Sequence, residues 1–144
     1  MDKKKLKQYI SLKKEQKMLD KKLDKLRERV LDIPTVLGKV KGSREEFPYI
    51  ETHMTVYMDE PKQADVVRRQ TRINEKRKEQ VDTLLIEIEE FIAAIPDSVT
   101  RQIFELVFLE GKTQQEVADL FGWERSNISK KINGYLKLSH NSQR

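Results

Sequence analysis

Apolar side chains recur at alternating steps of three and four residues along the first 33 residues of the chain. Together with Gln16, which completes the repeat, the positions are Tyr9, Leu12, Leu19, Leu23, Leu26, Val30 and Ile33. This spacing is typical of a heptad seam on one face of an α-helix. Residues 1–32 contain neither glycine nor proline, so the pattern predicts one uninterrupted amphipathic helix there.

A second pattern of the same kind predicts a helix from about Asp65 to Ile95. Its apolar positions are Val81, Leu84, Ile88, Phe91 and Ile95. The stripe is weaker upstream, where Ile73 shares it with the polar Arg77. Pro96 ends this helix because the residue before a proline is disfavoured in the α conformation.

Charge along the two predicted helices is complementary. Residues 1–30 carry 12 basic and 5 acidic side chains, whereas residues 81–97 carry 5 acidic and no basic ones. We therefore expect a long antiparallel helical hairpin. Heptad spacing does not decide whether two seams pair within one chain or between two copies, so a homodimer through this region is an open alternative.

The segment between the helices, at about residues 34–62, differs from both. Pro34, Gly38, Gly42 and Pro48 interrupt helix, and residues 49–58 are rich in β-forming side chains with partial alternation. We expect one or two short strands. Because an isolated two-stranded ribbon is only marginally stable, this small β-containing insertion should pack on the helices or on a partner.

Composition narrows the class of protein. Lys+Arg number 29 and Asp+Glu number 24, and the net charge of +5 favours a nucleic-acid partner. The chain has no cysteine, which excludes disulfides and zinc fingers. No stretch approaches the roughly 18 consecutive apolar residues that a membrane span requires, so no membrane partner is expected.

Neither catalysis nor a metal or other cofactor is expected. His53 and His140 lie far apart in the sequence, and neither has a second ligand at helical spacing. Glu87 and Glu89 point to different faces of a helix, without a nucleophile or a phosphate-binding loop. The sequence therefore favours a binding protein over an enzyme.

Short helices are expected after the hairpin, and a capping box marks the most informative of them. Asp97 or Ser98 can cap a helix that reaches about Leu109. Thr113 and Glu116 then have the spacing at which each side chain accepts a hydrogen bond from the other residue's amide. The buried face of the helix that follows is assigned to Val117, Ala118, Leu120 and Phe121.

A tight turn and a further amphipathic helix complete this pattern. Gly122 stands where a positive φ turns the chain sharply, and Trp123, Ile128 and Ile132 form the apolar face of the next helix. Ala118 is small enough for the two helices to approach closely. Two short helices with this spacing are typical of a helix-turn-helix.

The remaining face of the second helix carries polar and basic side chains suited to base edges and phosphates in the major groove. Together with the start of the first helix, the residues expected to contact DNA are Thr113, Gln114, Arg125, Ser126, Asn127, Ser129, Lys130 and Asn133. A secondary basic patch, either a nucleic-acid arm or a solvated helix face, consists of Lys13, Lys14, Lys17 and Lys21.

The C-terminal part resembles region 4 of sigma-70-type transcription factors, which reads the minus-35 promoter element. The motifs that carry the resemblance are Ile95-Pro96-Asp97-Ser98, Arg101-Gln102-Ile103-Phe104-Glu105-Leu106, Leu109-Glu110-Gly111-Lys112-Thr113, Glu116-Val117-Ala118, Phe121-Gly122 and Ile128-Ser129. The resemblance implies a helix-turn-helix that binds double-stranded DNA and, less firmly, a contact with host RNA polymerase. No segment resembles the sigma domain that melts promoter DNA, so the chain is not expected to initiate transcription alone.

A second resemblance involves the insertion. Residues Lys39-Val40-Lys41-Gly42-Ser43 and Glu46-Phe47-Pro48-Tyr49, with the junction at residues 95–98, resemble small phage and prophage regulators of the RinA/ArpU late-gene activator type. This resemblance implies a role in transcription regulation in the cytoplasm of a bacterial host, at the nucleoid.

These patterns predict a mainly α protein. We expect a helical hairpin or coiled-coil region at residues 1–95 with the insertion at about 34–62, a sigma region-4-like helix-turn-helix domain at 96–138, and a tail at 139–144. The expected function is sequence-specific DNA binding that regulates phage or prophage late genes. Two alternatives stay open, a small terminase-like DNA-packaging subunit and a structural or protein-interaction module without specific DNA binding.

Overall fold

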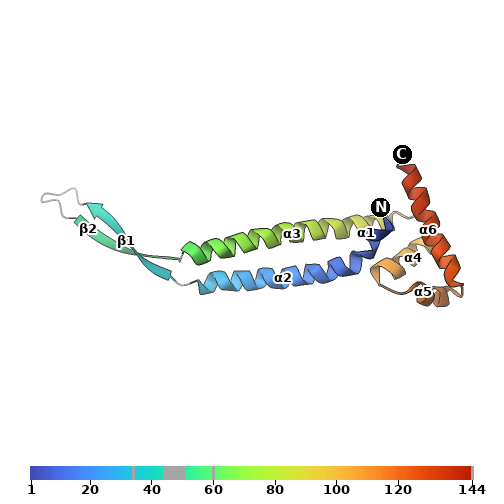
Figure 1. Cartoon of the computed structure of the whole chain (residues 1–144), viewed down its shortest axis with the longest axis horizontal. Helices are drawn as coiled ribbons and strands as arrows, with labels where there is room; N and C mark the ends of the chain where they lie inside the picture. Colours follow the sequence, from blue (N-terminus) through green and yellow to red (C-terminus); the bar gives the residue numbers. More distant parts are fainter. Residues whose placement is uncertain (34, 44–50, 60, 144) are drawn as a thin grey trace. The chain divides into compact units, whose positions relative to one another are not determined.

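A computed structural model describes residues 1–33, 35–43, 51–59 and 61–143 of the chain (Figure 1). Within these ranges the elements are α1 (Lys3–Lys7), α2 (Tyr9–Asp32), β1 (Thr35–Ser43), β2 (Glu51–Asp59), α3 (Pro61–Ala93), α4 (Ser98–Phe104), the π-helical turn η1 (Glu105–Leu109), α5 (Gln114–Phe121) and α6 (Arg125–Ser142). The mainly helical fold is thereby confirmed. The chain forms two compact units, unit 1 with residues 1–18 and 77–144 and unit 2 with residues 19–76.

The first helix is interrupted at Gln8, which corrects the expectation of one continuous helix. The Gln8 amide donates to the Lys5 carbonyl at 3.1 Å, three residues back rather than four. This tighter turn ends α1, and α2 begins at Tyr9. Figure 1 shows α1 set at an angle to α2.

Helices α2 and α3 run antiparallel, as predicted (Figure 1). In unit 1, Lys5 Nζ lies 2.7 Å from Glu87 Oε2, and Gln16 Nε2 donates to Asp82 Oδ1 at 2.6 Å. The residue number of the partner on α3 therefore decreases as the residue number on α1 and α2 increases, as in an antiparallel pair. The expected complementarity between a basic first helix and an acidic end of α3 accounts for the Lys5–Glu87 ion pair.

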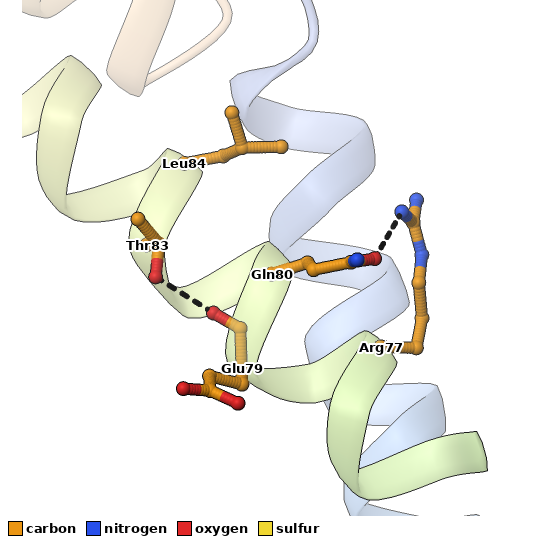
Figure 2. A pocket seen from close by; sticks show the side chains of 5 residues that line it. All are labelled: Arg77, Glu79, Gln80, Thr83 and Leu84. Carbon is orange, nitrogen blue, oxygen red and sulfur yellow. Dashed lines mark hydrogen bonds between the residues drawn. The ribbon is translucent and has the colours of Figure 1, made fainter.

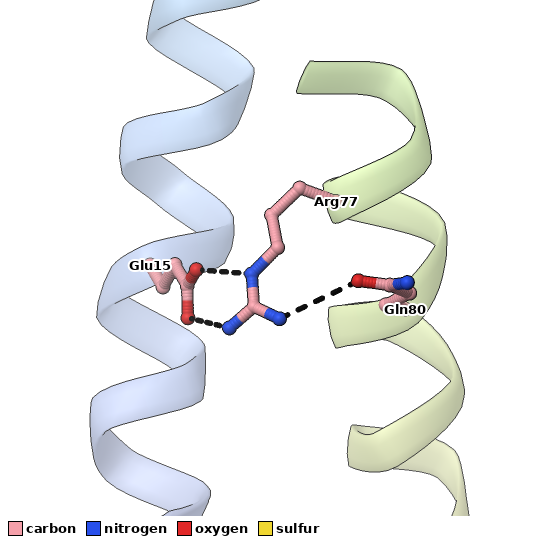
Figure 3. A network of polar contacts seen from close by, with 3 residues as sticks. All are labelled: Glu15, Arg77 and Gln80. Carbon is pink, nitrogen blue, oxygen red and sulfur yellow. Dashed lines mark hydrogen bonds and ion pairs between the residues drawn. The ribbon is translucent and has the colours of Figure 1, made fainter. Parts of the chain in front are cut away.

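A bidentate ion pair between Arg77 and Glu15 also joins α3 to α2 within unit 1 (Figure 3). Arg77 Nε and Nη2 donate to the two carboxylate oxygens of Glu15 at 2.7 and 3.2 Å. Arg77 Nη1 also donates to Gln80 Oε1 at 3.5 Å. The carboxylate of Glu15 raises the pKa of Arg77 by accepting these hydrogen bonds. Arg77, the polar member of the predicted stripe, is thus an ion-pairing residue and not a core residue.

The buried seam of α3 differs from the predicted one at two positions. Its buried residues in unit 1 are Val81, Leu85, Ile88 and Ile92, and Ile95, two residues after the helix ends at Ala93, is also buried. Leu84 and Phe91, assigned to the seam from the sequence, are only half-buried. Both neighbouring pairs, 84/85 and 91/92, are apolar, so the heptad pattern fits either choice and packing decides between them. Leu84 borders a polar pocket with Arg77, Glu79, Gln80 and Thr83 (Figure 2).

Unit 2 has a small core of its own. Leu23, Leu26 and Val67 are buried together, and Ile33 packs against them. Val30 and Ile73, both assigned to the predicted seams, are instead exposed. In this stretch of α3 it is Val67 that packs against α2. Ile73 lies six residues further along, on a different side of the helix, and is therefore exposed.

Helix α3 begins at Pro61, four residues before the predicted start. Proline is well tolerated in the first turn of a helix, where its missing N–H would have no partner in the helix. The backbones of β1 and β2 pair antiparallel, from Thr35 opposite Asp59 to Ser43 opposite Glu51. The motif at residues 46–49 that resembles phage regulators lies outside the described residues.

Candidate nucleic-acid interface

Asp97 starts the helical part that follows α3. Its carboxylate accepts hydrogen bonds from the Thr100 amide at 3.0 Å and from the Thr100 hydroxyl at 2.5 Å. These hydrogen bonds lower the pKa of Asp97. Helix α4 continues directly into η1, which ends at Leu109 as the sequence predicted.

The predicted capping box is present at the start of α5. Thr113 Oγ1 accepts from the Glu116 amide at 3.2 Å, and the Glu116 carboxylate accepts from the Thr113 amide at 3.0 Å. Because both of these amides have partners, the helix has a defined first residue. This fixes where α5 begins relative to the preceding turn.

The end of α5 is equally well defined. Gly122 has φ +66°, and its amide donates to the Asp119 carbonyl at 3.3 Å. The Trp123 amide donates to the Ala118 carbonyl at 2.8 Å, which completes a Schellman motif. The predicted positive φ at Gly122 is confirmed, and helix α6 starts only three residues later.

Helices α5 and α6 pack through a small apolar interface. Val117, Ala118, Ile128 and Ile132 have no exposed surface. Leu120, which the sequence analysis placed on the buried face, is 62% exposed. The centre of the buried face lies between Val117, Ala118 and Phe121, and Leu120 falls beyond its edge at the 100° step of a helix.

Three aromatic contacts involve residues of α5, α6 and the turn between them. Phe121 and Trp123 are half-buried, and their ring centroids lie 5.5 Å apart. Tyr135 of α6 lies 5.5 Å from Phe104 and 5.9 Å from Phe91, between centroids. Aromatic packing therefore holds α6 against α3 and α4 within unit 1.

This packing leaves one face of α6 to solvent. Arg125, Ser126, Asn127, Lys130 and Asn133 are exposed, and Ser129 is half-buried. Ile128, Ile132 and Leu136 are buried, and five of the six predicted α6 residues are exposed. At 100° per residue these six positions span about 200° of α6, so they cover more than half of its circumference.

The two predicted contact residues of α5 occupy its first turn. The Thr113 hydroxyl is engaged as the cap acceptor, and Gln114 is half-buried. Gln114 lines a cleft that also contains side chains from α1, so its surroundings differ from those expected for a separate C-terminal domain.

Helix α1 is an unexpected neighbour of this motif. Leu6 is completely buried, and Lys3 Nζ donates to Asn133 Oδ1 at 3.0 Å. Asn133 Nδ2 in turn donates to Ser129 Oγ at 3.3 Å. Sequence reasoning missed Lys3 as a neighbour of the candidate site, because the heptad analysis began at Tyr9; the apolar Leu6 among lysines was the available signal.

The four lysines of the predicted secondary patch have different surroundings. Lys13 Nζ lies 3.5 Å from Glu89 Oε1 and 5.5 Å from the centre of the Tyr9 ring. Lys14 and Lys17 are exposed in unit 1, and Lys21 is exposed in unit 2. Lys13 therefore serves the α2–α3 contact, whereas the other three point to solvent.

Among the residues that the structure describes, no group of histidine, cysteine, aspartate and glutamate side chains is arranged to hold a metal ion. His140 is exposed near the end of α6, and the side chain of His53 lies outside the described part. None of the helices in the described ranges has the length and apolar character needed to cross a membrane.

Comparison of the chain with models of protein families, with curated proteins and with solved structures finds no match.

Proposed function

We propose that the protein binds double-stranded DNA through α5 and α6 and regulates transcription by reading a specific sequence, in the manner of a sigma region-4-like regulator of phage or prophage genes. One observation carries this proposal. A capped α5, a Schellman turn at Gly122 and a buried Ile128–Ile132 face leave the polar side of α6 accessible.

The exposed face of α6 has the chemistry that a major groove requires. Arg125 and Lys130 supply positive charge for guanine edges or phosphates, and Ser126 and Asn127 supply both donors and acceptors. No acidic side chain occurs between Arg125 and the end of α6. Within α6 a duplex backbone would therefore meet basic and polar side chains, while the carboxylate of Glu124 lies at the start of the helix, 3.5 Å from the Ser126 hydroxyl.

A role in the bacterial cytoplasm at the nucleoid follows from the same proposal. The proposal also includes a contact with host RNA polymerase, which the resemblance to sigma region 4 supports. It includes pairing of two copies through the helical region, which the heptad seams support. A dimer would read an inverted repeat, whereas a single copy would read one element.

The proposal is tested by selecting bound duplexes from bacterial and prophage genomic fragments at about 150 mM salt, where weak attraction to phosphates is largely screened. Recovery of one motif is expected. Failure to recover a motif, with binding that disappears steeply as salt rises, would contradict specific reading. That result would instead favour a packaging subunit or a protein-interaction module.

Lys130→Ala tests the assigned face on the recovered motif. A base contact would cost about 1–3 kcal/mol at one base pair and relax the preference there, whereas a phosphate contact would weaken all duplexes alike. Lys76→Ala is the matched control, because Lys76 is exposed on α3 and the change removes the same charge. Equal affinities of the two variants would count against α6 as the reading helix.

A further inference from the structure

Helix α1 lies beside α5 and α6, and its residues Lys3 and Lys7 are close to these helices. Leu6 anchors α1 in the core of unit 1, where it has no exposed surface. Ile10, one turn further along, packs against the backbone of Gly111 in the turn before α5. Two apolar contacts therefore hold the start of the chain in a defined position.

A cleft opens between α1 and the start of α5. Lys3, Lys7 and Lys112 line it together with Thr113 and Gln114, above an apolar floor that includes Ile10 and Phe108. Its volume is about 290 Å³. Three lysine side chains thus line one cleft with the two predicted contact residues of α5.

The charges in this cleft are only partly balanced. Lys112 Nζ lies 3.6 Å from Glu110 Oε2. Lys3 donates to the neutral amide of Asn133 and Lys7 is exposed. The carboxylate of Glu116, which accepts from the Thr113 amide at 3.0 Å, is the second acidic group at this surface. Three lysines against two carboxylates beside α6 leave a net positive charge, which favours an anionic partner.

We propose that Lys3, Lys7 and Lys112 bind the phosphate backbone of the duplex that α6 reads, so that α1 is part of the DNA interface. This inference rests on the proposed duplex binding. Lys3 links the two surfaces directly, because Asn133, its hydrogen-bond acceptor, belongs to the candidate contact set. DNA backbone that flanks the major groove at α6 would enter the cleft, and the lysines would replace its counterions.

The test measures how duplex affinity depends on salt for the full-length protein and for Lys3→Gln/Lys7→Gln, with a mixed-sequence duplex of about 30 base pairs as the probe. Each phosphate contact contributes about 0.9 to the slope of log affinity against log salt. We expect the slope of the double variant to fall by up to about 2. The charge-preserving Lys3→Arg/Lys7→Arg variant should retain most of the original slope.

Lys22→Gln/Lys25→Gln is the matched control, because these lysines are exposed on the part of α2 in unit 2 and the same two charges are removed. A slope and affinity of Lys3→Gln/Lys7→Gln equal to those of this control would overturn the inference. Tighter binding by the cleft variant would also overturn it, since α1 would then be shielding α6.

The failure of this inference is distinguishable from that of the proposed function. If the unmodified protein binds the probe and selects a motif while the cleft variant behaves like its control, only the role of α1 is wrong. If the unmodified protein does not bind duplex DNA, both proposals fall. Helical content and thermal unfolding of each variant show whether a loss of binding reflects a loss of folding; if the glutamine variant unfolds, single Lys7→Gln on the folded chain gives the same comparison.

Discussion

Gly111 and Ile10 are in direct contact, although 101 positions separate them in the chain: a Cβ on residue 111 would overlap the Ile10 δ-methyl. Gly111 also has φ +75°, a conformation that side chains with a Cβ rarely adopt. The turn before α5 and the start of α2 therefore depend on a glycine for two separate reasons.

Gly111→Ala is expected to lower the free energy of unfolding by more than Gly122→Ala. The left-handed conformation costs a non-glycine residue about 1–2 kcal/mol at either position. Only Gly111 adds an overlap with Ile10, since nothing lies within 4 Å of a Cβ on Gly122. The δ-methyl of Ile10 ends a flexible side chain that is 36% exposed, so a rotation relieves the overlap and the additional loss is small. Urea-induced unfolding of both variants measures the difference.

Two further variants control this comparison. Gly134→Ala should raise the free energy of unfolding by about 0.5–1 kcal/mol, because Gly134 lies within α6 with open space around it. Ile10→Ala in the Gly111→Ala background should recover the part of the loss that comes from overlap. Equal losses for Gly111→Ala and Gly122→Ala would show that the contact with Ile10 adds nothing.

Leu85→Ala should destabilise the protein clearly more than Leu84→Ala. Leu85 is 3% exposed in the helical core, and truncating a buried leucine costs about 2–5 kcal/mol. Leu84 is half-buried beside the polar pocket at Arg77, so its truncation leaves a smaller cavity. Chemical unfolding of the two variants decides which residue belongs to the seam, and the reverse order would restore the heptad assignment.

The hydrogen bond between Tyr9 and Glu89 makes the free energy of unfolding depend on pH in the alkaline range. Tyr9 donates to Glu89 Oε1 at 2.6 Å, and burial together with this carboxylate raises the pKa of Tyr9 from 10.0 to about 12. The folded state therefore favours the protonated phenol. Its contribution is complete below pH 10 and is lost as the pH rises toward 12.

Tyr9→Phe isolates this effect, because phenylalanine keeps the ring and removes the hydroxyl. The unmodified protein should exceed the variant in free energy of unfolding at about pH 8, and the difference should shrink above pH 10. Urea titrations at several pH values measure it. A difference that is constant across this range would contradict the assigned pKa shift.

Asp97 also stabilises the folded protein, but its contribution is lost at low pH instead of high pH. Its pKa is lowered from 3.8 by the hydrogen bonds from Thr100, with smaller effects from Lys131 and Arg101. The stabilisation is present above pH 3.8 and is lost as the pH falls through the lower pKa of the folded state.

Asp97→Asn retains an acceptor at the start of α4 but does not titrate. The difference in Tm between the unmodified protein and this variant should be positive at neutral pH and should decrease below pH 3.8. Thermal unfolding monitored by circular dichroism at each pH measures it. Parallel Tm curves for the two proteins would rule out this role of Asp97.

Local signals in the sequence predicted the two ends of α5 correctly. The capping box at Thr113 and the positive φ at Gly122 involve residues no more than a few positions apart, so residue types and spacing suffice to predict them. The heptad pattern likewise predicted the α2–α3 pair and the buried Ile88. The heptad pattern failed at Leu84 and Val30, and the assignment of Leu120 to the buried face of α5 was also wrong. At these positions only the neighbouring elements decide whether an apolar side chain is buried.

The sequence by itself determined the helical class and the two ends of α5, because periodicity and capping are local properties. It indicated an antiparallel hairpin but left open whether the two seams pair within one chain. Only the tertiary structure decided that α2 pairs with α3, that Leu6 is buried, that Ile10 packs on Gly111 and that Lys3 reaches Asn133. The last two contacts join residues more than 100 positions apart. They depend on how packed helices place distant side chains, which no repeat along the chain encodes.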